Sequence, residues 1–367
     1  MAMKPLPRIL NIKPYQPGKP IEDVKRELGL TSVIKLASNE SPYGPSPKVC
    51  AAIAKAGRTV NRYPDSSCYY LRKALARHVG CREDQLIFGN GSDEVIVTAI
   101  RAFVGEGDEI VMARPSFLIY DIATRVAGGR VKAVPMKDFH YDLDGMAKAV
   151  GPKTKIVFIA NPDNPAGTYI PERDLLGFLK SINPDTVVFL DEAYYEFIRE
   201  KDYPDALRLL ADMPQLIVSR TFSKVYGLAG LRIGYGIARP EMIDVLTRVS
   251  EPFNVNSVAQ AAALACLKDR AYYRRIMREM ESQRELLFQE LTALGLGYVR
   301  TYTNFVLIRV PGQASDVCRG LLHKGVIVRD MNAWGIENYI RVTIGTPGEN
   351  KRFLKALKFV LKKINTK

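Results

Sequence analysis

One short segment holds several side chains that could act together in catalysis. TFSKVYGLAGLRIGY, residues 221 to 235, places the hydroxyls of Thr221 and Ser223 beside a single lysine, Lys224, and carries Arg232 further along. Hydroxyls and a fixed arginine can together satisfy the oxygens of a phosphate group. A lysine amine can bond covalently to a carbonyl compound. The residues around Arg232 are apolar, so we expect its charge to meet a buried anion.

Two other motifs follow predicted strands and offer polar groups at strand ends. GNGSDE, residues 89 to 94, opens a predicted helix, and its first-turn N–H groups at Ser92 and Asp93 suit a phosphate. NPDNPAGTYI, residues 161 to 170, contains two Asn-Pro steps, which predict a rigid turn that holds the amide of Asn164 in place.

A buried carboxylate completes the set. TVVFLDEAY places Asp191 where an apolar strand ends, and a carboxylate there is costly unless it meets a cation or hydrogen-bond donors. Pyridoxal phosphate requires a lysine for its Schiff base, an acid on its ring nitrogen, donors to its O3′ and a phosphate anchor. Each requirement has a candidate here, so the sequence predicts this cofactor.

The elements that position these residues follow an alternating pattern. From Leu86 to Ala238, short apolar runs alternate with segments of helical periodicity; the runs are LIFG, EIVMA, KIVFIA, TVVFLDEAY, QLIVSRTF and IGYGIA. Apolar strands separated by helices predict an α/β fold with a mostly parallel sheet covered on both faces. Ligands of such sheets bind outside the carboxyl ends of the strands.

The rest of the chain does not show this regular alternation of short strands and helices. Residues 257 to 294 predict a long helical stretch that stops at Gly295, and NFVLIRV, VIVRD and YIRVTIGT predict strands around the helix ASDVCRGLLHKG. The proline-rich first fifty residues are expected to wrap over the body or to reach a partner chain. We predict an N-terminal arm with part of a small domain at 1–49, a large cofactor-binding domain at 50–255, and a connecting helix with the C-terminal small domain at 256–367.

Composition narrows the class of protein. Hydrophobic residues make up 47% and charged residues 25% of the chain, which is ordinary for a globular protein. Five scattered cysteines and three histidines predict neither a disulfide framework nor a metal site. The net charge of +14 is spread along the chain, so small anionic ligands are expected rather than nucleic acid. No apolar run predicts a membrane span or a signal peptide, so a cytoplasmic location is expected.

The ordered set of motifs resembles the fold type I, pyridoxal-phosphate-dependent aminotransferases, and within them the histidinol-phosphate aminotransferase branch. The motifs are ASNESPYGPSP, RYPD, GNGSDE, NPDNPAG, DEAYYEF, TFSK, GLAGLRIGY, VIVRD and YIRVTIGT. The resemblance implies a large domain with a mostly parallel seven-stranded sheet flanked by helices, a smaller α+β domain, and a homodimer.

Roles at the cofactor are also implied by the resemblance. Lys224 would carry the cofactor and move the proton at the substrate carbon, and Asp191 would keep the pyridine nitrogen protonated. Asn164 and Tyr194 would donate to O3′, and Tyr120 of PSFLIY would stack on the ring. The cofactor phosphate would be held by Ser92, Asp93, Thr221, Ser223 and Arg232, with Tyr63 of RYPD reaching it from the neighbouring subunit.

The same resemblance implies a set of substrate contacts. Arg341 would clamp the α-carboxylate, and Arg329 would meet the phosphate of histidinol phosphate or the side-chain carboxylate of glutamate. Tyr15 would close over the substrate from the N-terminal arm, and Asn39 would lie near it.

The predicted reaction is the interconversion of L-histidinol phosphate and 2-oxoglutarate with imidazole-acetol phosphate and L-glutamate, in histidine biosynthesis. An aromatic amino acid aminotransferase and, less favoured, a threonine-phosphate decarboxylase remain alternatives, because the sequence separates their substrate sites poorly. A transcription regulator with an aminotransferase-like domain needs a DNA-binding domain ahead of it. Since ASNESPYGPSP begins by residue 37, this reading is not expected.

Overall fold

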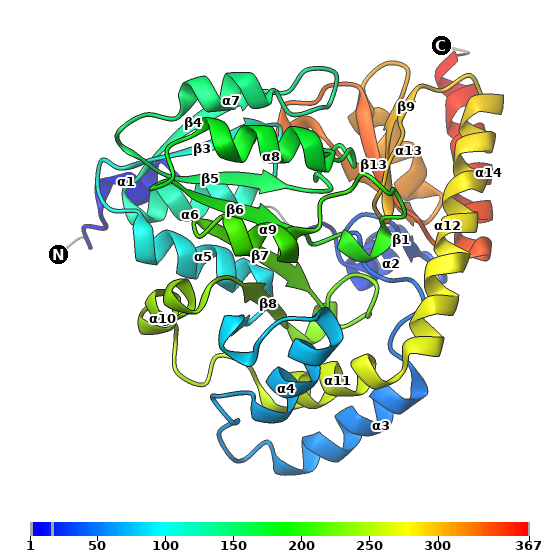
Figure 1. The fold of residues 1–367 in the computed structure, drawn as a ribbon. Coiled ribbons are helices and arrows are strands. Elements are labelled where there is room, and N and C mark those ends of the chain that lie inside the picture. Colours follow the sequence, from blue (N-terminus) through cyan, green and yellow to red (C-terminus); the bar gives the residue numbers. More distant parts are fainter. Residues whose placement is uncertain (1–2, 16–17, 366–367) are drawn as a thin grey trace.

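A seven-stranded sheet forms the centre of the computed structural model, which describes residues 3–15 and 18–365 (Figure 1). Its spatial order is β2-β8-β7-β6-β5-β3-β4, and β8 alone runs antiparallel to its neighbours. The strands are β2 (Leu86–Gly89), β3 (Glu109–Arg114), β4 (Arg130–Pro135), β5 (Thr154–Ala160), β6 (Val187–Asp191), β7 (Leu216–Thr221) and β8 (Gly234–Ile237). The predicted α/β class with a mostly parallel sheet is confirmed.

Helices cover both faces of this sheet, because the central strands are apolar on both sides. In β6, Val187 and Phe189 pack into one buried cluster, while Val188 and Leu190 pack into the other. The first cluster lies under α5 (Ser92–Phe103), α6 (Leu118–Ala127) and α10 (Pro240–Arg248); the second lies under α7 (Leu143–Ala149), α8 (Glu172–Ser181) and α9 (Ala206–Asp212), which are in front in Figure 1.

A second, antiparallel sheet is built from the C-terminal third in the order β12-β13-β10-β9. Its strands are β9 (Tyr298–Val299), β10 (Phe305–Arg309), β12 (Arg329–Asp330) and β13 (Tyr339–Thr343), with α13 (Ala314–His323) and α14 (Pro347–Asn365) nearby. The N-terminal region joins it, because β1 (Ile34–Lys35) pairs in parallel with β11 (Val326–Ile327). The remaining helices of this region are α1 (Pro7–Leu10), α2 (Ile21–Leu28), α3 (Pro47–Ala56) and α4 (Tyr69–Val79).

The predicted long helix is two helices. Asp269 leaves the helical conformation, with φ −109° and ψ 50°, and separates α11 (Ser257–Lys268) from α12 (Arg270–Ala293). Its carboxylate instead accepts a hydrogen bond from Lys48 Nζ at 3.2 Å. Strand β4 was absent from the predicted runs because it is an edge strand with only partly buried side chains. The domain boundaries at 49/50 and 255/256 remain a prediction.

Within the described part of the chain, no helix combines the length and apolarity that crossing a bilayer requires.

Candidate active site

The carboxyl ends of β5, β6 and β7 meet at a cavity of about 490 Å³. This is the edge of the sheet at which ligands of mostly parallel sheets bind, as predicted from the sequence. The cavity brings together residues that lie more than two hundred positions apart in the chain. Of the predicted site residues, it is lined by Tyr15, Ser92, Asp93, Tyr120, Asn164, Asp191, Tyr194, Thr221, Ser223, Lys224 and Arg232.

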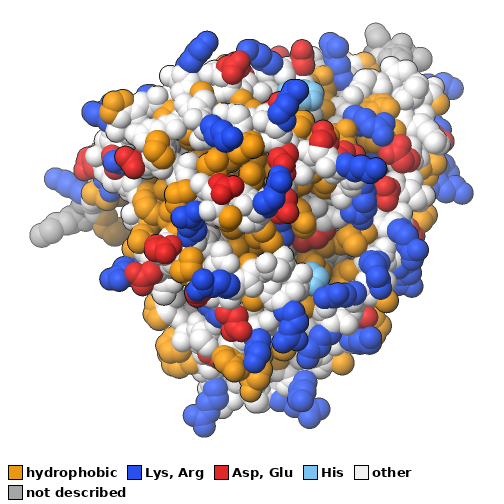
Figure 2. All heavy atoms as spheres, viewed as in Figure 1, with side chains coloured by type: hydrophobic (Ala, Val, Ile, Leu, Met, Phe, Trp, Pro, Cys, Tyr) orange, Lys and Arg blue, Asp and Glu red, His pale blue; other side chains and the backbone are white. Residues whose placement is uncertain are grey.

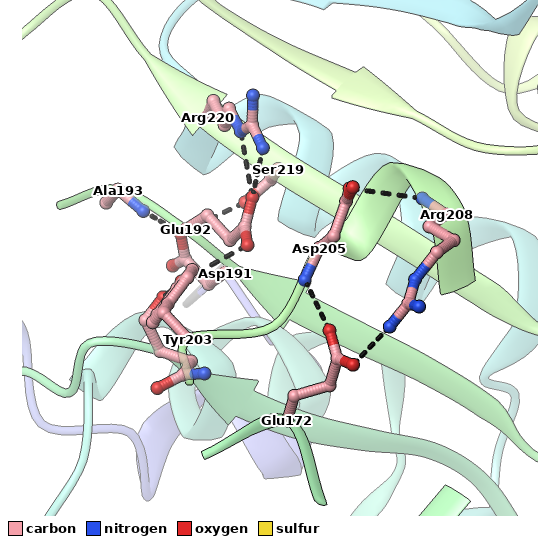
Figure 3. A network of polar contacts seen from close by, with 10 residues as sticks. Glu172, Asp191, Glu192, Ala193, Tyr203, Asp205, Arg208, Ser219 and Arg220 are labelled. Carbon is pink, nitrogen blue, oxygen red and sulfur yellow. Dashed lines mark hydrogen bonds and ion pairs between the residues drawn. The ribbon is translucent and has the colours of Figure 1, made fainter. Parts of the chain in front are cut away.

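Asp191, at the end of β6, is a buried carboxylate surrounded by donors. It accepts a hydrogen bond from the hydroxyl of Tyr120 at 2.7 Å. It also accepts from the hydroxyl of Ser219 at 3.0 Å and from the backbone N–H of Ala193 at 3.2 Å (Figure 3). Burial raises the pKa of Asp191 above its ordinary value. Among the described residues it has no ion-pair partner. A protonated ring nitrogen would supply the missing positive charge.

Lys224 follows β7 in a tight turn. The N–H of Gly227 donates to the carbonyl of Lys224 at 3.1 Å, and the N–H of Leu228 donates to the carbonyl of Phe222 at 3.0 Å. The lysine Nζ lies 5.4 Å from the centre of the Tyr194 ring. Lys224 and Asp191 therefore line the same cavity from neighbouring strands.

An anion cradle lies at the N-terminus of α5. Gly91 has φ +84° and ψ 163°, a backbone conformation that glycine adopts readily and that L side chains rarely adopt. Arg232 donates from Nη2 to the carboxylate of Asp93 at 3.2 Å. First-turn N–H groups and a fixed guanidinium form a site that suits a phosphate. The residues of the cavity therefore fit pyridoxal phosphate at both its ring and its phosphate.

Asn164 is held between its own loop and a strand of the second sheet. The side chain of Asn161 closes the loop by accepting from Ile170 N–H at 2.8 Å and donating to Ile170 carbonyl at 3.1 Å. Arg341 of β13 then donates from Nη1 to Asn164 Oδ1 at 2.5 Å. This contact ties the predicted O3′ donor to the predicted carboxylate clamp.

Arg341 is 6% exposed, and its buried Nε has no hydrogen-bond partner among the described residues. Burial lowers the pKa of Arg341, and the nearby charge of Arg329 lowers it further. The two arginines are register partners on β12 and β13. Two adjacent guanidinium groups, one with an unused buried donor, suit an anionic substrate.

Several predicted residues lie outside the lining of the cavity. Asn39 borders it by donating from Nδ2 to the hydroxyl of Tyr194 at 2.9 Å. The guanidinium of Arg329 lies 6.0 Å from the centre of the Tyr15 ring. Tyr63 is 84% exposed and stacks on Phe253 with ring centres 4.8 Å apart, away from the cavity of its own chain.

Two aromatic residues of PSFLIY, Phe117 and Tyr120, line the cavity, and the stacking predicted for Tyr120 stays a prediction. The ring of Tyr120 is fully buried and stacks on Phe158 with centres 4.5 Å apart, and its hydroxyl is bonded to Asp191. Phe117, only partly buried, also lines the cavity but was not singled out in the sequence. Ser219 was missed as well. Phe117 lies in PSFLIY and Ser219 in QLIVSRTF, but neither the spacing nor the residue type shows which side chain faces the ligand.

Comparisons with known proteins agree with this geometry. Residues 31–357 match the family model described as aminotransferase class I and II. Histidinol-phosphate aminotransferase of Moorella thermoacetica is 48% identical over 355 residues, covering 96% of this chain and 92% of the relative. Histidinol-phosphate aminotransferase 2 of Carboxydothermus hydrogenoformans is 45% identical, covering 96% of this chain and 97% of the relative.

A solved structure is similar over almost the whole chain. The crystal structure of histidinol-phosphate aminotransferase from Sinorhizobium meliloti in complex with pyridoxal-5′-phosphate superposes with a TM-score of 0.90 at 28% identity, covering 99% of both chains.

Proposed function

The chain belongs to the class I and II aminotransferase family, and we propose on this basis that it interconverts L-histidinol phosphate and 2-oxoglutarate with imidazole-acetol phosphate and L-glutamate. It is a pyridoxal-phosphate-dependent aminotransferase. The observation that carries the proposal is the cavity in which Lys224, the buried Asp191 and the α5 anion cradle converge. The substrate is inferred from the identity of 48% and 45% to two histidinol-phosphate aminotransferases, each alignment covering 96% of this chain.

When bound, pyridoxal phosphate supplies a carbonyl group that takes up the amino group and a ring that withdraws electrons from the reacting carbon. Lys224 Nζ holds the cofactor and carries the proton to and from that carbon. Asp191 keeps a proton on the ring nitrogen, because the carboxylate is buried and needs a cation. Ser92, Asp93, Thr221, Ser223 and Arg232 hold the phosphate.

We assign the ring-stacking contact to Phe117. The hydroxyl of Tyr120 is already committed to Asp191, so we assign Tyr120 to orienting that carboxylate. Asn164 and Tyr194, which line the same cavity, would donate to O3′. Tyr63 serves the cavity of a second subunit in a homodimer, since in its own chain it is exposed and outside the cavity.

Substrate anions are bound by the two arginines at the border of the second sheet. Arg341, which contacts Asn164, binds the α-carboxylate of L-glutamate. Arg329 binds the side-chain carboxylate of L-glutamate or the phosphate of L-histidinol phosphate. Tyr15 and Asn39 close the site from the N-terminal side. A guanidinium group can donate two parallel hydrogen bonds to a carboxylate or to a phosphate. One pocket can therefore bind both amino donors, L-glutamate and L-histidinol phosphate. A cytoplasmic location stays a prediction.

The test is a single half-reaction. Protein loaded with pyridoxal phosphate is mixed with L-histidinol phosphate in the absence of a keto acid, and the visible absorbance of the bound cofactor is followed. We expect rapid conversion to the pyridoxamine form, faster than with L-tyrosine or L-phenylalanine. Faster conversion by an aromatic amino acid would move the function to aromatic transamination, and release of CO₂ from threonine phosphate would indicate a decarboxylase.

A further inference from the structure

The two arginines to which the proposed function gives the substrate anions share one aromatic neighbour. The centre of the Trp334 ring lies 4.9 Å from Cζ of Arg329 and 5.6 Å from Cζ of Arg341. A guanidinium within about 6 Å of a ring centre is attracted to the ring, and tryptophan attracts it most strongly. Trp334 is not part of the lining of the candidate active site, so the proposed reaction leaves it without a role.

Among the described residues, no other aromatic ring makes this contact with both arginines. The second aromatic neighbour of Arg329 is Tyr15, whose ring centre lies 6.0 Å from the Arg329 Cζ. The second neighbour of Arg341 is Phe305, whose ring centre lies 5.2 Å from the Arg341 Cζ. The two distances to Trp334 limit how far apart the guanidinium groups can lie, so Trp334 is placed to set their separation.

Arg341 needs such support because its charge is buried. On the face shown in Figure 2, Lys and Arg side chains are spread over the surface with Asp and Glu side chains among them. Arg341 is only 6% exposed, and it has no ion-pair partner among the described residues. Its register partner is Arg329, whose positive charge repels it. The negative face of an aromatic ring offsets part of this repulsion while no substrate is bound.

Trp334 is itself fixed by packing and by its backbone. The ring belongs to a small buried cluster with Leu307, Met331 and Ile336, and the backbone N–H of Trp334 donates to the Met331 carbonyl at 2.9 Å. The indole Nε1 is buried and makes no hydrogen bond among the described residues, so packing determines how the ring is oriented. The short helix Asn332–Trp334 connects β12 to β13, the strands that carry the two arginines. The ring and both arginines therefore belong to one continuous segment.

We propose that Trp334 is a positioning residue that fixes the separation of Arg329 and Arg341 and thereby selects ligands whose two carboxylates match this separation. The proposal rests on the proposed function, because it takes the two arginines as the groups that bind the carboxylates of L-glutamate. Two guanidinium groups at a fixed separation distinguish a dicarboxylate of the right length from shorter and longer ones. Without the ring the arginines repel each other and adopt several separations, so this selection weakens. An acid with one carboxylate needs only Arg341, so its binding changes little.

Length selection is measured with unreactive acids that compete with L-glutamate in the half-reaction of protein loaded with pyridoxal phosphate. Succinate, glutarate and adipate carry two carboxylates at increasing spacing, and pentanoate carries one. For wild type we expect glutarate, which has the chain length of glutamate, to bind about tenfold more tightly than the other acids. Trp334→Leu should weaken glutarate binding about tenfold and bring the three dicarboxylates within about threefold of one another. Pentanoate binding should change less than about twofold, because it depends on one arginine.

Two further variants separate positioning from a general loss of structure. Trp334→Phe keeps an aromatic ring and should retain most of the preference for glutarate. Tyr339→Leu is the matched control, because Tyr339 packs against the same buried cluster but makes no cation–π contact with either arginine. Its preference for glutarate should equal that of wild type. The circular dichroism spectrum and the absorbance of the bound cofactor are measured for each variant to compare folding and loading.

Three results would overturn the proposal: an unchanged glutarate preference in Trp334→Leu, an equal loss of that preference in Tyr339→Leu, and an equal loss of affinity for pentanoate in Trp334→Leu. A wild-type protein that binds all four acids equally would contradict both this proposal and the substrate contacts of the proposed function. Failure of wild type to convert L-histidinol phosphate would contradict the proposed function alone, because the glutarate measurement still decides the role of Trp334.

Discussion

At the scale of single residues, the properties of Asp191 come from what surrounds it. Three donors fix the carboxylate, and none of them carries a positive charge. Such an arrangement orients the side chain but leaves its charge to be answered by the cofactor. In the proposed site, the three hydrogen bonds orient the Asp191 carboxylate. Its negative charge, which no cation of the protein balances among the described residues, favours a protonated ring nitrogen.

This division of roles predicts the effect of Asp191→Asn. The amide keeps the shape of the side chain but carries no charge, so the ring nitrogen loses its proton. We expect kcat to fall by about a hundredfold to a thousandfold, as when other electrostatic contacts to a reacting group are removed. Steady-state kinetics with L-glutamate measures it. Ser219→Ala removes one neutral donor and should cost less than tenfold; an equal loss in both variants would show that orientation, not charge, is decisive.

Asp163 gives a prediction about pH. It is fully buried, accepts from Ala166 N–H at 2.8 Å and from the hydroxyl of Tyr141 at 3.1 Å, and burial raises its pKa to about 7. The folded state therefore binds this proton more tightly than the unfolded state, whose pKa is near 4. Stability from this group is complete below about pH 4 and falls as pH rises to about 7, by at most about 1.4 kcal/mol per pH unit.

Asp163→Asn should remove this loss. We expect the free energy of unfolding of the variant, relative to wild type, to increase from pH 5 to pH 7.5 and to stay level above that. Urea denaturation at a series of pH values measures the difference. Asp138→Asn, at an exposed position, is the control and should follow the wild-type profile. Parallel curves for Asp163→Asn and wild type would contradict the raised pKa.

Residue types and their places after strands were enough to predict the chemistry of the site. Lys224, Asp191 and Arg232 stand out because a charge beside an apolar strand needs a partner. Phe117 could not be told from Tyr120 in the same way. Both are aromatic residues of one short segment and both line the cavity; they differ in that Tyr120 packs on Phe158 and donates its hydroxyl to Asp191.

At the scale of elements, successive side chains at the ends of β6 and β7 point to opposite sides of the sheet, one set toward the candidate active site and the next into a buried ion pair. Asp191 and Ser219 are register partners, and the next residues, Glu192 and Arg220, point to the other side and form a buried ion pair (Figure 3). The guanidinium of Arg220 lies 3.6 Å from the centre of the Tyr195 ring. Two charges in contact thus fasten the ends of the strands that carry Asp191 and Lys224.

Removing one partner of this pair should be costly. Arg220→Gln leaves Glu192 charged and buried, and we expect the free energy of unfolding to fall by about 3–5 kcal/mol. The double variant Glu192→Gln/Arg220→Gln should lose less than Arg220→Gln alone. Urea denaturation measures both. Arg248→Gln breaks the exposed pair with Asp244 and should cost less than about 1 kcal/mol. A similar small loss in Arg220→Gln would mean that the pair contributes little.

The elements themselves were predictable to different degrees. Continuous apolar runs identified the central strands, because both of their faces are buried. Edge strand β4 lacks that signal, since its side chains are only partly buried. The break at Asp269 was missed because aspartate also occurs inside helices. At the break its carboxylate accepts a hydrogen bond from Lys48, which is distant in sequence and so gives no local signal.

At the scale of the whole molecule, several aromatic side chains are exposed on the surface of the single chain. Tyr63 and Phe253 stack on each other at the surface, and Tyr69 and Tyr70 are also exposed nearby in the chain. Exposed apolar side chains of this kind often mark an interface. No single-chain pattern shows where a partner binds, so the sequence predicted the second subunit only through the family resemblance.

Subunit mixing tests whether each site is shared between two chains. Lys224→Ala and Tyr63→Ala homodimers should both be slow, but a mixed dimer would hold one site with neither substitution. After denaturation and joint refolding of equal amounts, random pairing should restore about a quarter of the wild-type turnover per chain. Mixing Lys224→Ala with Arg341→Ala is the control, because Arg341 contacts Asn164 of its own chain and restores no site. If Tyr63 served its own chain, the first mixture would stay as inactive as the control.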